Sequence, residues 1–269
     1  MQKQIKHWMI IGSSRGLGAA FVEEFLNRTS GDILGVARTS PDQIKNHEKW
    51  TATGRYRYLQ LDIALSQSRQ VLQLILQEIA PEPVGVIFNA AHIEKDLNTD
   101  QSLNYDAYEQ VNRVGITGLG NLLFAFEPHL LTYGGILVGI SSLWGSVPPL
   151  FLPWMAYPAS KAYLNMAFHC LRVAWRKRVD VVLVNIGNIG GGEKSSLPAW
   201  IVPTYAMAAQ KIGRALLRTN VPKAINYPVW HAVIYNYVLR FVPEFCYSWI
   251  FRLYFTLDAF QKRHRLRKS

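Results

Sequence analysis

Short apolar runs alternate with amphipathic helical segments over about the first 190 residues of the chain. Six of the runs have the length and the Val/Ile/Leu content of strands buried in a parallel sheet. They cover residues 7–11, 32–38, 56–63, 84–91, 135–142 and 181–186. Apolar residues at three- and four-residue spacing predict helices after residue 18 and over 66–79, 104–126 and 157–178. This alternation predicts an α/β fold built on a doubly wound parallel sheet.

The first apolar run opens directly into a glycine-rich loop that precedes a helix. A strand, a glycine turn and a helix N-terminus together form an anion site, because free N–H groups and the helix dipole point toward the phosphate. This context favours dinucleotide binding over a simple tight turn. The candidate cofactor-binding residues of the loop are Gly12, Ser14, Arg15, Gly16, Leu17 and Gly18.

The second apolar run ends at a base rather than an acid. An acidic residue at this strand end accepts hydrogen bonds from a ribose 2′-OH, whereas an Arg suits a 2′-phosphate. Here the charged residue is Arg38, and Arg15 lies in the glycine loop beside it. The two cations favour NADP over NAD, unless Arg38 is only a solvated strand end.

The third and fourth runs end in residues that suit an adenine-bearing cofactor. Asp62 and Ile63 close the third run, where the carboxylate can meet the adenine edge. Asn89, Ala90 and Ala91 close the fourth run, and their small side chains leave room for a cofactor across the strand end. We therefore count all five as candidate cofactor contacts.

Candidate acid/base chemistry centres on Tyr157 and Lys161, which lie about one helical turn apart and so share a helix face. A free phenol titrates near ~10 and exchanges protons poorly at neutral pH unless a cation stabilises the phenolate. Lys161 is placed to be that cation and to lower the pKa of Tyr157. The fifth run ends in hydroxyls that face the ligand crevice, at Ser141 and Ser142.

An asparagine stands in the middle of the helix predicted at 104–126. Helix propensity disfavours this position for Asn112. The residue therefore indicates either a polar task or a satisfied structural amide.

In these features the chain resembles the short-chain dehydrogenase/reductase family, over about residues 7–192. The family's glycine motif TGxxxGxG matches residues 11–18, with Ile11 in place of the Thr. Its NNAG motif appears in weakened form at 88–91, and Tyr157 with Lys161 fits YxxxK. The resemblance implies a Rossmann-type fold and NAD(P)-dependent hydride transfer between nicotinamide and a carbonyl or an alcohol.

The resemblance also implies roles for four catalytic residues. Tyr157 would donate a proton to the carbonyl oxygen in reduction and remove it in oxidation. Ser142 would hold that oxygen, and Lys161 would lower the pKa of Tyr157 and bind the nicotinamide ribose. Asn112 matches the family's helix asparagine and would keep a water-linked proton relay connected through Lys161. Tyr157 and Lys161 thus count as cofactor-binding residues as well.

The loop between the serine and the tyrosine departs from the family pattern. Ser142 and Tyr157 lie fifteen residues apart, about two more than the family spacing, and the loop contains Pro148, Pro149 and Pro153. The partner of the substrate oxygen therefore stays open among three serines, Ser141, Ser142 and Ser146.

The segment after the sixth run departs as well. The family's PG motif reads Ile186-Gly187, and Gly191 stands where a threonine often follows. Both changes touch the nicotinamide pocket. We therefore expect the protein to hold the cofactor there through the backbone near Ile189.

The net charge of +11 suits an anionic ligand, a phosphate-bearing cofactor or an acidic membrane surface. It is not concentrated like a nucleic-acid arm except at the end, so we predict no nucleic-acid partner. Cys170 and Cys246 lie in apolar segments without metal-ligand neighbours. This predicts reduced core thiols, no metal site and a cytoplasmic location, and no signal peptide is evident at the start.

The region beyond residue 192 should cover the substrate and then change character. An apolar lid is expected at 198–203 and a helix at 206–217. Aromatic and aliphatic residues then mark helical faces at 229–241 and 245–260, before a basic tail. Such helices can lie on an anionic membrane, or they pack on the domain or on another subunit. We interpret residues 228–269 as a helical extension of one domain at 1–227.

Together these features predict an NADP-preferring oxidoreductase that acts on a hydrophobic carbonyl or secondary alcohol. We expect a cytoplasmic homo-oligomer, with peripheral association at a membrane left open. The competing hypothesis is a catalytically weak or inactive Rossmann protein that binds nucleotide as a sensor or scaffold. The altered nicotinamide-pocket motifs favour that hypothesis, and the intact Asn112, Ser142, Tyr157 and Lys161 oppose it.

Overall fold

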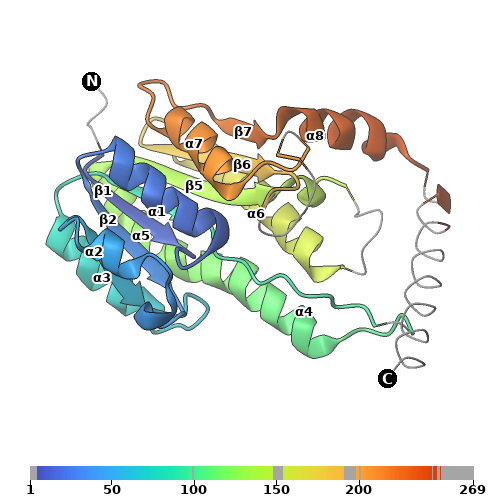
Figure 1. The fold of residues 1–269 in the computed structure, drawn as a ribbon, viewed down its shortest axis with the longest axis horizontal. Helices are drawn as coiled ribbons and strands as arrows, with labels where there is room; N and C mark the ends of the chain where they lie inside the picture. Colours follow the sequence, from blue (N-terminus) through green and yellow to red (C-terminus); the bar gives the residue numbers. More distant parts are fainter. Residues whose placement is uncertain are drawn as a thin grey trace.

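A computed structural model of the chain describes residues 5–98, 100–147, 154–190, 198–199, 201–243, 245, 246 and 249. In this part of the chain seven parallel strands form one sheet, in the order β3-β2-β1-β4-β5-β6-β7. Helices cover both faces of the sheet (Figure 1), which confirms the doubly wound α/β fold. The strands are β1 His7–Ile11, β2 Asp32–Ala37, β3 Tyr56–Gln60, β4 Val84–Phe88, β5 Gly135–Ser142, β6 Val179–Ile186 and β7 Ala224–Tyr227.

The seventh strand corrects the sequence-based expectation of six. β7 has four residues, of which two are exposed and none is fully buried. It forms the edge of the sheet beside β6. A strand that depends on pairing rather than on its own burial carries no continuous apolar run, which is why the pattern missed it.

Eight α-helices occur in the described residues: α1 Gly16–Arg28, α2 His47–Thr51, α3 Ser68–Ile79, α4 Tyr105–Asn112, α5 Gly118–Tyr133, α6 Ala156–Ala174, α7 Tyr205–Leu216 and α8 Val229–Val233. α1 and α7 pack on one face of the sheet, where Phe21, Phe25 and Ile212 share a core. α3, α5 and α6 cover the other face, with Leu72 and Phe168 in a second core. The helix predicted at 206–217 is therefore confirmed as α7.

The single helix predicted at 104–126 consists of three parts. α4 ends at Asn112, a π-helical turn follows at Arg113–Thr117, and α5 begins at Gly118. A π-turn inserts a wider loop of backbone into an α-helix and is frequent at functional sites. Side-chain periodicity does not reveal such a turn, because both flanking segments are helical.

The prediction that both cysteines are core thiols is wrong. Cys170 is free and exposed on α6, and Cys246 is free and partly exposed. The buried side of α6 is formed instead by residues such as Leu164 and Phe168. An apolar neighbourhood in sequence therefore did not determine which side of the helix Cys170 occupies.

Some predicted features lie outside the described residues. They are Pro148, Pro149 and Pro153 of the enlarged loop, Gly191, Trp200 in the lid, most of the segment at 245–260 and the basic tail.

The strand order creates a crevice beyond the carboxyl end of β1. Ile11, the last residue of β1, pairs with Val36 of β2 on one side and with Phe88 of β4 on the other. The order of strands reverses between β1 and β4, and ligands of such sheets bind outside the carboxyl ends of strands at this point. The glycine loop and the ends of β4 and β5 therefore face one crevice.

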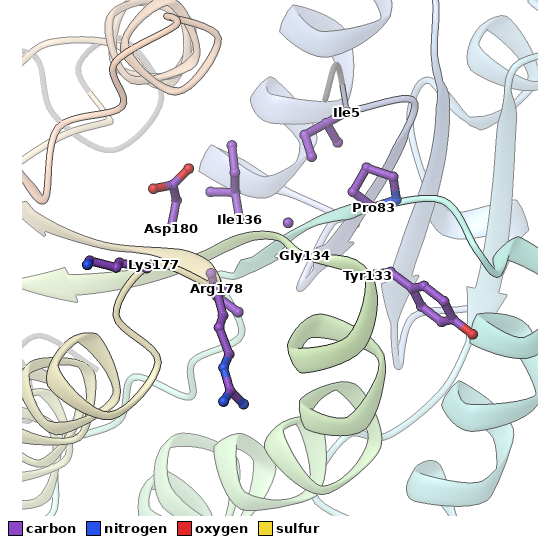
Figure 2. Close-up of a pocket in the computed structure, with 10 residues that line it drawn as sticks. Ile5, Pro83, Tyr133, Gly134, Ile136, Lys177, Arg178 and Asp180 are labelled. Carbon is purple, nitrogen blue, oxygen red and sulfur yellow. The ribbon is translucent and has the colours of Figure 1, made fainter. Parts of the chain in front are cut away.

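A pocket of about 320 Å³ lies at the opposite, amino edge of the sheet, near the starts of β5 and β6. Figure 2 shows that the charged ends of Lys177, Arg178 and Asp180 diverge from one another around it. A ligand site needs polar groups that converge. This pocket is therefore not a candidate site.

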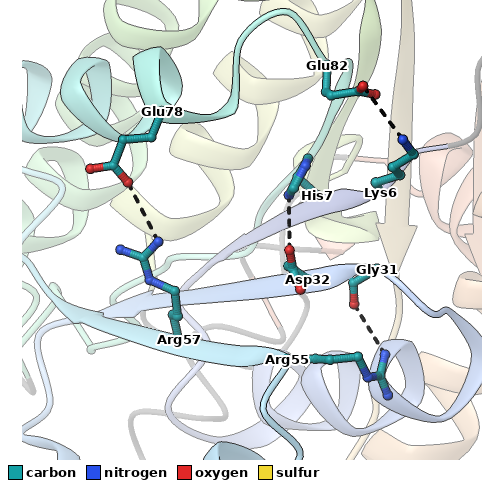
Figure 3. Close-up of polar contacts among 8 residues, drawn as sticks. All are labelled: Lys6, His7, Gly31, Asp32, Arg55, Arg57, Glu78 and Glu82. Atoms are coloured by element: carbon teal, nitrogen blue, oxygen red, sulfur yellow. Dashed lines mark hydrogen bonds and ion pairs between the residues drawn. The ribbon is translucent and has the colours of Figure 1, made fainter.

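Exposed ion pairs connect neighbouring elements at the same edge (Figure 3). The N···O distance is 3.6 Å for both Lys6 with Glu82 and Arg57 with Glu78. Beside them, the His7 ring nitrogen Nδ1 lies 3.5 Å from the Asp32 carboxylate. Exposed pairs of this kind contribute little to stability.

Arg55 makes stronger contacts than these pairs. Its guanidinium donates to Leu26 O at 2.6 Å, Thr29 O at 2.7 Å and Gly31 O at 3.2 Å; the last contact is drawn in Figure 3. Carbonyl groups at the end of a helix lack intrahelical donors. Arg55 therefore satisfies the C-terminal end of α1, the helix whose other end carries the glycine loop.

Candidate active site

The glycine loop makes a tight turn between β1 and α1. Gly12 and Gly16 have φ angles of +87° and +56°, and a Cβ on Gly12 would lie 2.8 Å from Ala90 Cα. The Asn89 side-chain amide donates to Gly12 O at 2.9 Å and holds the turn. The first turn of α1 contains no acidic residue. Its N–H groups and dipole are therefore suited to an anion, and the loop fits a phosphate-bearing cofactor.

The other loop residues lie behind or beside this turn. Leu17 and Gly18 are buried in the first turn of α1. The Ser14 hydroxyl accepts a hydrogen bond from Thr39 Oγ1 at 3.0 Å, so the glycine loop contacts the residue after Arg38. Thr39 was not a predicted site residue, because only the fold brings the end of β2 to the loop.

Arg15 and Arg38 occupy the same rim of the crevice, since each is next to a member of the Ser14–Thr39 pair. Both side chains are exposed. Neither guanidinium forms an ion pair with a residue that the structure describes. The rim is therefore cationic.

The residues after β3 are held in a turn. Asp62 Oδ1 accepts from Ala64 N at 3.0 Å, and the carbonyl of buried Ile63 accepts from Asn121 Nδ2 at 2.8 Å. After β4, Ala90 is partly buried and Ala91 is exposed. The chain thus presents short side chains beside Gly12, as predicted for the end of the fourth run.

The structure brings Ser142, Tyr157 and Lys161 together at the carboxyl end of β5. The Ser142 hydroxyl lies next to the Tyr157 phenol and acts to lower its pKa. The Lys161 ammonium lies 5.5 Å from the centre of the Tyr157 ring and donates to Ile140 O at 2.9 Å. The three side chains come from one strand end and one turn of α6.

The pKa values of this cluster differ from the expectation that Lys161 lowers the pKa of Tyr157. Burial raises the pKa of Tyr157 to about 12, and the Ser142 hydroxyl lowers it only in part. Burial also lowers the pKa of Lys161 to about 8. Desolvation therefore outweighs charge stabilisation in this arrangement, because the ammonium hydrogen-bonds a carbonyl rather than the phenol oxygen.

Three serines were candidates for the partner of the substrate oxygen, and the geometry favours Ser142. Ser141 is buried and its hydroxyl donates to Asn165 Oδ1 at 2.5 Å, behind the cluster. Ser146 is exposed at the end of a 3₁₀ turn, Leu143–Gly145. Of the three, Ser142 is the one whose hydroxyl acts on the pKa of Tyr157.

Asn112 is the last residue of α4, directly before the π-turn. The π-turn packs on α6, since a Cβ on Gly115 would lie 3.0 Å from Ser160 Cβ. Ser160 is the neighbour of Lys161. The π-turn therefore places the backbone next to Asn112 beside the helix that carries the acid/base pair.

Aromatic side chains that sequence reasoning missed surround Tyr157. The rings of Trp144 and Trp154 lie 6.0 and 6.1 Å from the Tyr157 ring, both edge to face, and 4.8 Å from each other. The Trp144 indole donates to the hydroxyl of Tyr235, beyond α8, at 2.7 Å. In the sequence, Trp144 and Trp154 lie on either side of the prolines of the enlarged loop between Ser142 and Tyr157. Their closeness to this unusual loop was the one feature of the sequence that could have marked them as site residues.

A buried carboxylate at the start of α6 was also missed. Asp96 is fully buried and accepts from Met155 N at 2.7 Å and Ala156 N at 2.6 Å. Its own carbonyl accepts from Asn104 N, the residue that caps α4. Asp96 therefore fixes the first turn of the helix that carries Tyr157.

The loop after β6 contacts both α7 and α8. Asn188 N donates to His231 Nδ1 at 3.1 Å, and Ile189 packs partly buried against the core. Gly190, with a φ of +99°, lies against the ring of Tyr205. Ile189, whose backbone was predicted to contact the cofactor, therefore lies in a loop that is held between α7 and α8.

The sequence matches the family model of the short chain dehydrogenases over residues 6–200. The seven-stranded parallel sheet with helices on both faces agrees with that match. The protein belongs to the short-chain dehydrogenase family. Members are oxidoreductases that use a nicotinamide cofactor and act on small molecules, which identifies the general class of reaction.

Solved structures confirm the fold. A short-chain dehydrogenase from Streptomyces avermitilis has a TM-score of 0.69 at 20% identity, over 100% of this chain and 97% of that one. An NADPH-bound carbonyl reductase from chicken fatty liver has a TM-score of 0.69 at 18% identity, over 83% and 97%. A serine dehydrogenase from Escherichia coli has 0.67 at 16%, over 83% and 98%. No curated protein gives a significant match to the sequence.

Proposed function

We propose that the protein catalyses NADP(H)-dependent interconversion of a hydrophobic carbonyl compound and the corresponding secondary alcohol. The observation that carries this proposal is the cluster of Tyr157, Ser142 and Lys161 at the end of β5. A phenol held beside a hydroxyl can exchange a proton with an oxygen that the hydroxyl positions. The cofactor supplies the hydride in reduction and accepts it in oxidation.

The chain's own residues supply the remaining steps. The Ser142 hydroxyl donates a hydrogen bond to the substrate oxygen and orients it toward Tyr157. The Tyr157 hydroxyl gives its proton to that oxygen in reduction and takes it back in oxidation. Lys161 binds the nicotinamide ribose and favours the phenolate when its ammonium faces the phenol. Asn112 keeps a water-linked relay connected through Lys161.

A preference for NADP is supported by the cationic rim. Arg15 and Arg38 are exposed and lie beside the Ser14–Thr39 contact, at the end of β2. A guanidinium suits a ribose 2′-phosphate at this strand end.

The preference is tested by titrating NADPH and NADH against Arg38→Ala. The variant should bind NADPH about tenfold more weakly, because a hydrogen bond to a charged group contributes ~1.5–3 kcal/mol. NADH affinity should not change, nor should either affinity in Arg57→Ala, which alters an exposed arginine at the far edge. An unchanged ratio in Arg38→Ala would refute the assignment.

A hydrophobic substrate is supported by the rings around Tyr157. Trp144 and Trp154 place large apolar rings beside the ring of Tyr157, and Tyr235 is joined to Trp144 by a hydrogen bond. Apolar walls with few polar groups select hydrophobic ligands and exclude water. Ketones with long or cyclic apolar groups should therefore be reduced faster than small polar ketones.

The experiment that tests the activity follows NADPH consumption with a panel of ketones. Tyr157→Phe should lower kcat by about 100-fold or more, the usual contribution of a positioned acid, and should still bind NADPH. Tyr163→Phe is the matched control, since Tyr163 is an exposed tyrosine on the same helix. Equal turnover by Tyr157→Phe and wild type would contradict the mechanism.

A second candidate function is nucleotide binding without turnover, as a sensor or scaffold. The raised pKa of Tyr157 favours this candidate, since a phenol with a pKa of about 12 exchanges protons slowly at neutral pH. The altered nicotinamide-pocket motifs, with Ile186-Gly187 for PG and Gly191 for the usual threonine, also favour it. NADPH binding with no turnover on any ketone or alcohol would select it over the enzyme.

Assembly into a homo-oligomer is a further part of the proposal. Large apolar side chains are exposed on α4–α6, including Tyr105, Phe124, Met166 and Val173. Apolar surface of this kind is commonly covered by another subunit. Light scattering of the full chain should give a mass above that of one chain, and a monomer at micromolar concentration would contradict this.

A further inference from the structure

The segment from α8 to residue 241 presents two different sides. One side contacts the active site. His231 accepts from Asn188 N in the loop after β6, and Tyr235 accepts from the Trp144 indole. Ala232 and His231 are buried. The segment follows β7 directly and projects past the end of the sheet (Figure 1).

The other side is apolar and exposed. Tyr237 and Phe241 are 73% and 75% exposed, and Trp230 and Val233 are 42% and 49% exposed. The same character continues at Phe245 and Trp249. These residues recur every three or four positions, so they line one side of the helical segment. We call this surface the outer face. Apolar surface of this extent is unusual in water unless something covers it.

The part of the sequence that carries the outer face is strongly basic. Residues 195–269 contain eleven Lys or Arg and two carboxylates, a net charge of +9, which leaves +2 for residues 1–194. Over the described stretch 201–243 the charged residues are all basic, namely Lys211, Arg214, Arg218, Lys223 and Arg240. Most of the positive charge thus belongs to the part of the sequence that carries the outer face.

This combination decides between the partners that an apolar face can have. A second copy docked through the same face would bring two segments of like charge together, which costs free energy. An anionic lipid surface instead takes aromatic side chains at its headgroup level and attracts Lys and Arg, at about 1 kcal/mol for each residue near the surface. Among the described residues no helix is long and apolar enough to cross a bilayer.

We propose that the outer face binds the surface of an anionic lipid bilayer. Trp230, Val233, Tyr237 and Phe241 enter the interfacial region, and basic residues of the C-terminal part contact the phosphates. Because the inner side of the segment holds Trp144 and the loop after β6, the active-site entrance lies near the membrane. This goes beyond the proposed reaction and does not depend on it.

The test is co-sedimentation of the full chain with vesicles. One set contains phosphatidylcholine alone and the other contains about 30% phosphatidylserine, which gives the negative surface potential that polybasic segments need. Wild type should sediment with the anionic vesicles and not with the neutral ones. Added salt should weaken the binding. Equal partitioning into both sets, or none into either, would overturn the proposal.

A double variant locates the contact. Tyr237→Ser with Phe241→Ser should lower the partition coefficient on anionic vesicles at least about tenfold, since it removes two apolar groups that the lipid interface would bury. The matched control is Leu74→Ser with Leu217→Ser, which changes two apolar residues of 62% and 38% exposure that lie outside the outer face and outside the α4–α6 surface. The control should bind as wild type does, and both variants should keep the thermal midpoint and NADPH affinity of wild type.

Light scattering without lipid distinguishes the competing partner. The proposal expects the same mass for wild type and for the Tyr237 and Phe241 double variant. A loss of oligomeric mass in that variant would show that a second copy covers the outer face and would overturn the proposal. Undiminished vesicle binding by the variant would overturn it as well, because the outer face would then not be the lipid contact.

Discussion

The indole of Trp144 donates a hydrogen bond of 2.7 Å to the hydroxyl of Tyr235. Trp144 follows the last residue of β5 by two positions, and its ring stands edge to face against Tyr157. Tyr235 belongs to the segment after α8. The contact therefore makes the C-terminal segment a wall of the candidate active site.

Removing the Tyr235 hydroxyl should loosen that wall without touching the reacting atoms. Tyr235→Phe leaves the partly buried Trp144 N–H without its acceptor, which costs about 1–3 kcal/mol if no water replaces it. KM for a hydrophobic ketone should rise several-fold, and kcat should change little. Tyr237→Phe is the control, since Tyr237 is 73% exposed and two residues away. A fall in kcat with unchanged KM in Tyr235→Phe would show that Tyr235 does not shape the substrate site.

The carboxylate of Asp96 should position Tyr157 through the start of α6. Asp96→Ala removes the acceptor for Met155 N and Ala156 N, so unfolding free energy should fall by about 1–3 kcal/mol. A shift of the Tyr157 helix should also lower kcat by about tenfold or more. Asp96→Asn keeps one acceptor oxygen and should restore most of both quantities.

A purely structural role for Asp96 predicts a different result. In that case Asp96→Ala would lose stability but would keep the kcat of wild type at temperatures well below its midpoint. Asp106→Asn provides the comparison, because Asp106 is an exposed acid in the first turn of α4. It should change stability by less than about 1 kcal/mol.

Lys161 should make the stability of the fold depend on alkaline pH. Its pKa is lowered from 10.5 to about 8 by burial, so between these values the unfolded chain binds more protons than the folded one. Stability therefore rises with pH in this window. Tyr157 opposes it only above pH 10, because its pKa rises from 10.0 to about 12 and the folded state then keeps the proton.

The measurement is the urea midpoint from pH 8 to 10 for wild type and Lys161→Met. The free energy of unfolding of wild type should gain about 1–3 kcal/mol relative to the variant across this range, at ~1.36 kcal/mol per pKa unit. Parallel curves for the two proteins would mean that the Lys161 ammonium is not desolvated.

Arg55 should stabilise the fold far more than the neighbouring surface arginine. Its three carbonyl acceptors, at Leu26 and Thr29 in the end of α1 and at Gly31 before β2, lose a charged donor in Arg55→Ala, which should cost about 2 kcal/mol. Arg57→Ala removes a 3.6 Å exposed pair and should cost less than about 0.5 kcal/mol. Thermal or urea unfolding of both variants compares them directly, and equal losses would contradict the capping role.

The inner strands could be predicted because a strand that is buried on both faces consists of consecutive apolar residues. All five residues of β4 are buried, and they form one continuous apolar run. β7 could not be predicted in this way, since it forms a strand through its hydrogen bonds to β6 and not through burial of its own side chains. The π-turn after Asn112 was hidden for a related reason, because its neighbours on both sides are helical.

The residues of the candidate site likewise differ in whether the local sequence could predict them. Tyr157 and Lys161 lie one turn apart, so helix geometry alone places them together. Asp96 and Ala156 are 60 residues apart in the sequence, and Trp144 and Tyr235 are 91 residues apart. At such separations a single sequence does not indicate which residues will be in contact. The pKa of Tyr157 depends on burial by residues that are far away in the sequence. Lys161 was therefore expected to lower this pKa, whereas desolvation raises it.

Tyr205 links the beginning of the cofactor crevice to its end. A Cβ on Gly16 would lie 3.5 Å from its ring, and a Cβ on Gly190 would lie 2.8 Å from its hydroxyl. Tyr205 starts α7, which packs against α1 through Ile212. The crevice is therefore complete only when α7 has docked. A nucleotide bound between these loops must, by mass action, lower the population of states in which α7 is open and so shield that helix from proteases.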